Sequence, residues 1–208
     1  MVRISLDKIS KRYGYQSILK NITHEFTSES ITGITGRNGS GKSTLVKIIS
    51  SYLSPSAGTI TYECQSKKLR PNQLALITSF TAPYIKVTQE MSLKEIFEFQ
   101  LKFSPFKISL EYSDFLDIIE LPNPKQKEIR FFSSGMQQKV NLAMAVLRKS
   151  DLLILDEPTS YLDQKAKEWF TNLLSENLKE RTVIIASNDK DDFQLVNNVI
   201  TIESGNLL

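Results

Sequence analysis

The chain has 208 residues, of which 40% are hydrophobic and 24% charged, and its 26 basic and 23 acidic residues leave a formal net charge of +3. This content suits one globular domain over residues 1–208. Basic residues cluster at 67–70 and 125–130. We interpret these short, scattered clusters as solvated faces, which excludes a nucleic-acid-binding role. One cysteine, no apolar leader and no run of about 18 apolar residues lead us to expect a reduced, cytoplasmic protein that reaches a membrane only through a partner.

The first third of the chain has a β-like pattern. Residues 1–35 alternate short apolar segments with turn signals, and Gly58–Glu63 has the same character. We therefore expect a small antiparallel sheet in this part of the chain. His24, the only histidine, falls in one of these segments and is expected to be structural.

A phosphate-binding motif follows. The sequence fits G-x-x-x-x-G-K-[ST] at Gly36, Arg37, Asn38, Gly39, Ser40, Gly41, Lys42, Ser43 and Thr44. Glycines let the backbone curl so that consecutive N–H groups point at phosphate oxygens, while Lys42 supplies a positive charge and the Ser43 hydroxyl a ligand for Mg²⁺. The motif predicts that the chain binds a nucleoside triphosphate.

The flanks of the motif support this prediction. A β-prone run, Ile31–Thr35, precedes it, and apolar residues follow it at helical spacing, namely Leu45, Ile48, Ile49 and Tyr52. Strand, loop and helix in this order bring the N–H groups and the positive dipole end of the helix to the phosphates.

The middle of the chain has a helical pattern. Apolar stripes occur at Leu93, Ile96, Phe97 and Leu101, and again at Phe115, Leu116, Ile118 and Ile119. A further helix is expected to start within Phe132–Val140 and to continue to about Arg148, with Ser134 and Gln137 as a capping box. We expect a helical lobe over about 84–148.

Two continuous apolar runs complete the fold prediction. Leu152–Leu155 and Val183–Ala186 lack alternation, which is typical of strands buried on both faces of a parallel sheet. Asp156 and Glu157 stand at the carboxyl end of the first run, where α/β sheets place ligands. We expect Asp156 to hold Mg²⁺ and Glu157 to orient and deprotonate the attacking water. The fold class is α/β, with a helical block inserted before the Asp156 strand.

Over essentially its whole length the chain resembles the nucleotide-binding ATPase subunits of ABC transporters. Phe132–Met136 stands where that family carries its signature Leu-Ser-Gly-Gly-Gln, and Pro158–Asp163 looks like the stretch that follows the family's catalytic glutamate. The resemblance implies a P-loop NTPase core with a mostly parallel sheet, an antiparallel β subdomain and an inserted helical subdomain, using ATP and Mg²⁺.

The resemblance also implies roles for individual residues. The signature residues Ser133, Ser134, Gly135 and Met136 would face ATP bound to a second subunit, so that two chains sandwich two ATP molecules head to tail. Ser160 and Asp163 would link the two sites across this dimer, and Tyr13 matches the aromatic residue that stacks on adenine.

Departures from the family concern hydrolysis. Pro83 stands where a glutamine normally enters the helical lobe, and Asn188 where a histidine follows the second apolar run. Proline has no side-chain amide, whereas Asn188 can still donate a neutral hydrogen bond to the γ-phosphate. We expect binding of Mg²⁺ and ATP, with hydrolysis slower than in relatives that keep the glutamine and histidine.

Three functions agree with these patterns to different degrees. The first is a transporter subunit on the inner face of the cell membrane, powering an integral membrane subunit as a homodimer or heterodimer. The second is a soluble ATPase of the same type that acts as an assembly or regulatory module. A metabolic P-loop kinase would have no reason to carry the segments 132–136 and 160–163 at these spacings.

Overall fold

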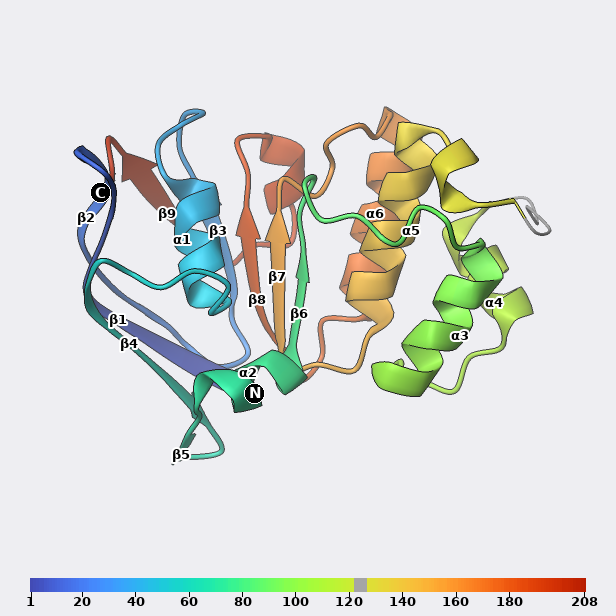
Figure 1. The fold of residues 1–208 in the computed structure, drawn as a ribbon, viewed down its shortest axis with the longest axis horizontal. Helices are drawn as coiled ribbons and strands as arrows, with labels where there is room; N and C mark the ends of the chain where they lie inside the picture. The colour runs from blue at the N-terminus through green and yellow to red at the C-terminus, as the bar shows by residue number, and fades with distance from the viewer. Residues whose placement is uncertain (122–126) are drawn as a thin grey trace.

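Two sheets lie side by side, with helices on both faces of the second (Figure 1). The computed structural model describes residues 1–121 and 127–208, so Lys125 of the expected basic cluster lies outside the described residues. The first sheet is antiparallel, in the order β2-β1-β4-β5. Its strands are β1 (Val2–Tyr13), β2 (Gln16–Phe26), β4 (Ala57–Cys64) and β5 (Lys67–Lys68). The predicted antiparallel β region is thus confirmed.

The second sheet has the order β10-β9-β3-β8-β7-β6 and is parallel except for β10, which pairs antiparallel with β9. Its strands are β3 (Ile31–Thr35), β6 (Thr78–Thr81), β7 (Leu152–Asp156), β8 (Thr182–Ala186), β9 (Asn198–Glu203) and β10 (Asn206–Leu207). Every residue of β7 and β8 is buried. The two continuous apolar runs are therefore central parallel strands, as predicted.

Helices connect and cover these strands. They are α1 (Lys42–Ile49), α2 (Pro71–Ile77), α3 (Leu93–Phe103), α4 (Tyr112–Ile119), η1 (Ile129–Phe131), α5 (Ser134–Leu147), α6 (Gln164–Glu176) and η2 (Lys190–Phe193). One apolar core lies between the two sheets and α1, and a second joins β7 and β8 to α3 through α6. The helices α3 to α5 occupy the expected inserted block, while its limits at about residues 84 and 148 as a separate lobe stay a prediction.

Two helix ends differ from the sequence prediction. Helix α1 ends at Ile49, and Tyr52, expected on its apolar face, is 73% exposed. The left-handed backbone of Ser51, with φ of 59°, ends the helical path before Tyr52 is reached. The cap of α5 is Ser133 rather than Ser134, because the Ser133 hydroxyl accepts the Met136 N–H. Gln137 donates instead to the carbonyls of Ile129 and Phe132, so the expected capping box is wrong.

In the described parts of the chain, none of the helices combines the length and the apolar character that a membrane span requires.

Candidate active site

The phosphate-binding motif forms a tight loop between β3 and α1. Gly36 has φ of +147°, and a Cβ there would lie 2.2 Å from the Ile202 carbonyl oxygen. Gly41 has φ of +112° and directly precedes the first residue of α1. Both positions combine a backbone that disfavours L side chains with a close neighbour, so the path of the loop depends on glycine. The amino end of α1 consequently opens toward the carboxyl edge of the sheet.

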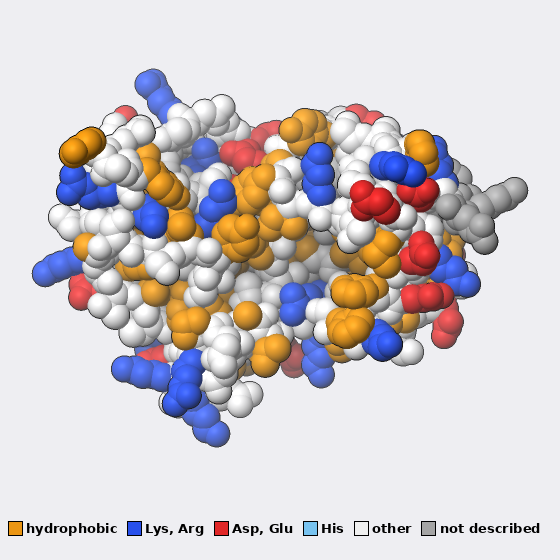
Figure 2. Space-filling view, viewed as in Figure 1, with side chains coloured by type: hydrophobic (Ala, Val, Ile, Leu, Met, Phe, Trp, Pro, Cys, Tyr) orange, Lys and Arg blue, Asp and Glu red, His pale blue; other side chains and the backbone are white. Residues whose placement is uncertain are grey.

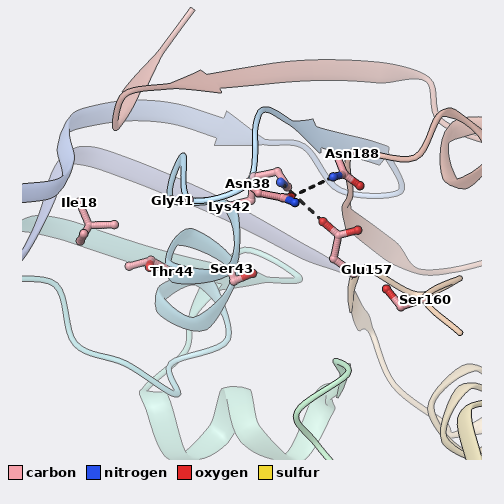
Figure 3. Close-up of a pocket in the computed structure, with 10 residues that line it drawn as sticks. Ile18, Asn38, Gly41, Lys42, Ser43, Thr44, Glu157, Ser160 and Asn188 are labelled. Carbon is pink, nitrogen blue, oxygen red and sulfur yellow. Dashed lines mark hydrogen bonds and ion pairs between the residues drawn. The ribbon is translucent and has the colours of Figure 1, made fainter. Parts of the chain in front are cut away.

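Three adjacent strands bring the predicted site together. The loop follows β3, Asn188 follows β8, and Asp156 and Glu157 end β7, so all three groups meet at one edge of the parallel sheet. They surround a pocket of about 620 Å³ (Figure 3). Its lining residues are Ile18, Asn38, Gly39, Gly41, Lys42, Ser43, Thr44, Glu157, Ser160 and Asn188. Such a pocket suits a polyphosphate better than an apolar ligand, because its lining is rich in donors.

Lys42 and Glu157 form an ion pair in the lining of this pocket (Figure 3). The Lys42 side chain is almost fully buried, and its Nζ donates to the Gly36 carbonyl at 2.8 Å and lies 3.5 Å from Glu157 Oε1. The amide of Glu157 is anchored to the Ala186 carbonyl at 2.7 Å, which fixes this residue in a left-handed conformation with φ of 46°. The cation and the carboxylate are therefore held at one end of the pocket by backbone contacts.

Asp156 and Ser43 form a pair of hard oxygen donors. Ser43 Oγ donates to Asp156 Oδ1 at 3.1 Å, and Asp156 is 1% exposed. Burial raises the pKa of Asp156, and a bound cation would offset the cost of keeping its carboxylate charged. Mg²⁺ takes few protein ligands and keeps waters and phosphate oxygens, so one hydroxyl and one carboxylate beside a phosphate loop fit it. The described residues contain no group of three or more His, Cys, Asp or Glu that could hold a metal alone.

Tyr84 also reaches this donor pair, although the sequence gave no signal for it. Its hydroxyl donates to Asp156 Oδ2 at 3.2 Å, and the Lys47 ammonium lies 4.0 Å from its ring centroid. Tyr84 directly follows Pro83, the residue that we expect to stand in place of the family's glutamine. The side chain that reaches Asp156 from this segment is thus the neighbouring tyrosine.

The loop after β8 is tied to both sides of the site. Asn188 Nδ2 donates to Asn38 Oδ1 of the phosphate loop at 2.9 Å. Ser187, which the sequence did not single out, has its Oγ 3.2 Å from Glu157 Oε2 and 2.5 Å from Asp192 Oδ2. Hydrogen bonds therefore join the loop after β8 to the phosphate loop and to Glu157.

Asp192 makes stability depend on pH. Burial raises its pKa to about 6 from an ordinary value of 3.8. Between about pH 4 and pH 6 the folded state keeps a proton that the unfolded state has released, so stability falls as pH rises through this window. Two units of pKa correspond to about 3 kcal/mol of folding stability lost by neutral pH.

Asp192→Asn should remove this loss of stability. Urea unfolding at about pH 4.5 and about pH 7.5 should then give free energies of unfolding that differ less in the variant than in the wild type. An equal difference in both proteins would contradict the assignment.

A second pocket, of about 450 Å³, lies around the start of α5. Among the residues that line it are Ser133, Ser134, Gly135, Met136, Tyr161 and Asp163. The start of α5 lies apart from the start of α1, on the other side of β6 and β7 (Figure 1). The chain thus brings part of its predicted loop together with Glu157 in one pocket, with Asp156 buried behind Ser43, and its predicted signature residues in another.

The segment between Glu157 and α6 connects the two pockets. Ser160 lines the first pocket and Asp163 the second. Asp163 caps α6, its Oδ1 accepting the Ala166 N–H at 2.8 Å, and Gln138 of α5 donates to the Pro158 carbonyl at 2.7 Å. This segment is therefore hydrogen-bonded to the helix that carries the signature residues.

Tyr13 lies outside the lining of the first pocket. Its side chain is 52% exposed, with the Lys11 ammonium 5.3 Å from the ring centroid. Ile18, which the sequence did not single out, lines the pocket instead. Stacking of Tyr13 on adenine stays a prediction. Ile18 adds an apolar side chain to the pocket lining. In the sequence, an apolar residue in a β-like segment looks the same whether it lines a pocket or packs in the core.

Comparison of the sequence with known proteins finds similarity to ABC transporter ATP-binding proteins. The family model described as ABC transporter matches residues 19–160. The uncharacterized ABC transporter ATP-binding protein YybJ of Bacillus subtilis is 32% identical over 196 residues, covering 91% of this chain and 87% of that protein. A probable ABC transporter ATP-binding/permease protein of Haemophilus influenzae is 29% identical over 223 residues. That match covers 99% of this chain but spans only 39% of the Haemophilus protein.

Solved structures show the same fold. The dimeric structure of MJ0796, a bacterial ABC transporter cassette, matches with a TM-score of 0.81 and 24% identity, over 98% of this chain and 96% of that one. A dimeric structure of MJ0796 in a post-hydrolysis state, bound to ADP and Pi, matches with a TM-score of 0.79 and 23% identity over the same shares. These likenesses establish the ABC ATPase cassette fold for this chain.

Proposed function

The chain belongs to the ABC transporter family of ATP-binding proteins and is an ATPase of that family, and from this premise we propose that it powers transport by a separately encoded membrane subunit. The observation that carries the ATPase site is the pairing of Lys42 with Glu157 and of Ser43 with Asp156 at one pocket. A relative described as an ATP-binding/permease protein supports a link between this ATPase and a membrane permease.

We propose a step in hydrolysis for each of these residues. Loop N–H groups and Lys42 would bind the phosphates, so that Lys42 exchanges Glu157 for a phosphate oxygen. Ser43 and Asp156 would hold Mg²⁺, which neutralises charge on the phosphate oxygens. Released from Lys42, Glu157 would accept a proton from water whose oxygen attacks the γ-phosphorus while the bond to the ADP oxygen breaks. Asn188 would donate to the γ-phosphate from the loop after β8.

A second subunit would complete this site. We propose that Ser133, Ser134, Gly135 and Met136 contact ATP bound to the other subunit, with Ser160 and Asp163 linking the two sites. The separation of the two pockets within one chain and the dimeric structures of MJ0796 support this arrangement. ATP would then hold two surfaces together, and hydrolysis would release them, which couples the nucleotide to a two-state movement.

Asn188 and Pro83 are proposed to make hydrolysis slow. Asn188 Nδ2 already donates to Asn38 Oδ1 at 2.9 Å, and an amide can only donate as a neutral group, whereas an imidazole can also carry a positive charge. Asn188→His should raise the steady-state rate at saturating MgATP about 10-fold, less than the roughly 10²–10⁴-fold of a general acid or base, because histidine would only strengthen a contact that Asn188 already offers. Asn188→Ala is the control for loss of the existing donor. A histidine variant that is no faster than the wild type would contradict the proposal.

The membrane subunit would dock beside α3. This chain would then lie peripherally on the inner face of the cell membrane. A groove of about 160 Å³ lies between α3, α5 and the segment after β6, lined in part by Phe80, Ile85, Val87 and Met144. Figure 2 shows hydrophobic side chains gathered over α3 beside a hollow. On this helix Phe99 is 57% exposed and Phe103 is 65% exposed, and their rings are 4.6 Å apart. An exposed aromatic pair beside a groove is typical of a protein interface.

Membrane association tests the transport proposal. The full chain, expressed in its native host, should sediment with membranes and be released together with an integral protein when detergent is added. Replacing Phe99 and Phe103 by Glu should move it to the supernatant without changing ATP binding. Ile108→Glu, at a 58% exposed position outside the groove lining, is the matched control. Recovery of the wild-type chain in the supernatant alone would favour the soluble assembly or regulatory module.

A further inference from the structure

A buried carboxyl group lies behind Glu157, at the far side of Ser187. Asp192, in η2, is 5% exposed, and its Oδ2 is 2.5 Å from Ser187 Oγ. Thr159 lies near this carboxyl group and favours its charged form, although within the described parts of the chain no donor meets full hydrogen-bond geometry at Oδ1. Carboxylates are seldom buried unless they are paired with a cation or hydrogen-bonded, and Asp192 takes part in none of the ion pairs between described residues. The Ser187 hydroxyl connects Asp192 to Glu157 by hydrogen bonds.

The hydroxyl of Ser187 lies between the two carboxyl groups. Its Oγ is 3.2 Å from Glu157 Oε2 and also accepts the Asp189 N–H at 3.0 Å. Two hydrogen bonds from one hydroxyl to two carboxyl groups need two protons, and Ser187 supplies one. The second must come from a carboxyl group, and burial, which raises the pKa of Asp192 to about 6, makes Asp192 the donor to Ser187 below that pH.

The neighbouring charges support the same direction of donation. Glu157 and Asp189 are the acidic groups that face Asp192, and both oppose its ionisation. Asp189 is itself paired with Lys167 of α6 at 2.5 Å, so this cation is already engaged beside the chain of oxygens. With its acceptor sites used by Asp189 and Asp192, Ser187 is left to donate toward Glu157.

We propose that Ser187 and Asp192 are positioning residues for Glu157, in that Asp192 fixes the Ser187 hydroxyl and this hydroxyl orients the Glu157 carboxylate toward the attacking water. The proposal rests on Glu157 acting as the base. The loop after β8 carries Asn188 in place of histidine. In this proposal the same loop also supplies the hydrogen bond from Ser187 that holds Glu157. Neither residue touches substrate in this scheme, so their effects should appear in kcat and leave KM for ATP unchanged.

Steady-state hydrolysis of MgATP by the purified full chain at about pH 5.5, where Asp192 still holds its proton, tests the proposal through a double-mutant cycle. Ser187→Ala and Asp192→Leu should each lower kcat about 10-fold with KM for ATP within about 2-fold of the wild type, and the double variant should be no slower than the worse single one. Asp192→Asn, whose amide can donate to Ser187 Oγ, should recover most of the rate lost in Asp192→Leu. Ser150→Ala, which removes another buried hydrogen-bonded hydroxyl, is the control for general loss of packing.

The outcomes separate this proposal from the assignment of the base. Full activity in Glu157→Gln would overturn the base itself and with it the proposal. Loss of activity in Glu157→Gln together with unchanged kcat in Ser187→Ala would overturn the positioning role alone. Effects of Ser187→Ala and Asp192→Leu that multiply in the double variant would do the same. If Asp192→Leu fails to fold, Asp192→Ala takes its place in the cycle. An Asp192→Asn rate as low as that of Ser187→Ala would count against the proposal.

Discussion

Glu157→Gln should lower the rate of ATP hydrolysis at least about 100-fold while the chain still binds MgATP, because a positioned base contributes about 10²–10⁴-fold to such reactions. Glutamine keeps the shape and the neighbourhood of Lys42 and Ser187 but cannot take a proton from water. Loss of the negative charge 3.5 Å from Lys42 also frees the ammonium for phosphate, so ATP affinity should not fall. Steady-state phosphate release and equilibrium nucleotide binding measure the two effects separately.

The same variant should accumulate ATP-bound dimers. If two chains enclose two ATP molecules, blocking hydrolysis removes the step that separates them, and size measurement with MgATP should show a dimer that the wild type populates only briefly. Glu176→Gln, an exposed position on α6, is the matched control for the change of charge. A Glu157→Gln chain that stays monomeric with MgATP at high protein concentration would count against the sandwich arrangement.

The sequence predicted the parts of the site that are contiguous in the chain. The phosphate loop, Lys42 and Ser43 lie on a strand–loop–helix unit whose local geometry follows from glycine and helix signals. Asp156 and Glu157 follow an apolar run, and such a run predicts a buried strand. These residues meet because carboxyl ends of parallel strands share an edge, which is a property of the fold class.

The residues that the sequence did not reveal reach the site through tertiary contacts. Tyr84 follows a proline in an irregular segment, and its contact with Asp156 depends on how β6 pairs with β7. Asp192 stands in an acidic run, 189–192, that in the sequence is typical of a solvated turn, yet η2 buries it behind Ser187. Periodicity detects which face of an element is apolar, so a single buried polar group in a short turn leaves no pattern to detect.

Helix limits were missed for a related reason. Ser133 and Ser134 are equally good capping residues by type, and the choice between them depends on where the chain leaves η1. The consequence for function is that the Ser133 hydroxyl is engaged with the Met136 N–H at 3.2 Å in the single chain. If Ser133 contacts ATP on a second subunit, its hydroxyl must accept from the helix and donate to phosphate at once, which one hydroxyl can do.

Lys42→Met is expected to weaken ATP binding about 100-fold, since a charge-assisted contact to phosphate is worth roughly 1.5–3 kcal/mol and a buried position strengthens it. Methionine fills much of the same volume but removes the ammonium that bonds Gly36 and pairs with Glu157. The Glu157 carboxylate then loses its only cation contact within the described chain, so nucleotide and carboxylate repel without an intervening charge.

Two measurements distinguish this effect from misfolding. Titration with a fluorescent ATP analogue should give the loss of affinity, and thermal unfolding without nucleotide should change little compared with it, because the loop path is fixed by Gly36 and Gly41 rather than by Lys42. Lys67→Met, at an exposed position of β5, provides the matched loss of one positive charge. ATP affinity within about 3-fold of the wild type in Lys42→Met would show that the pocket at the end of β3 is not where the phosphates bind.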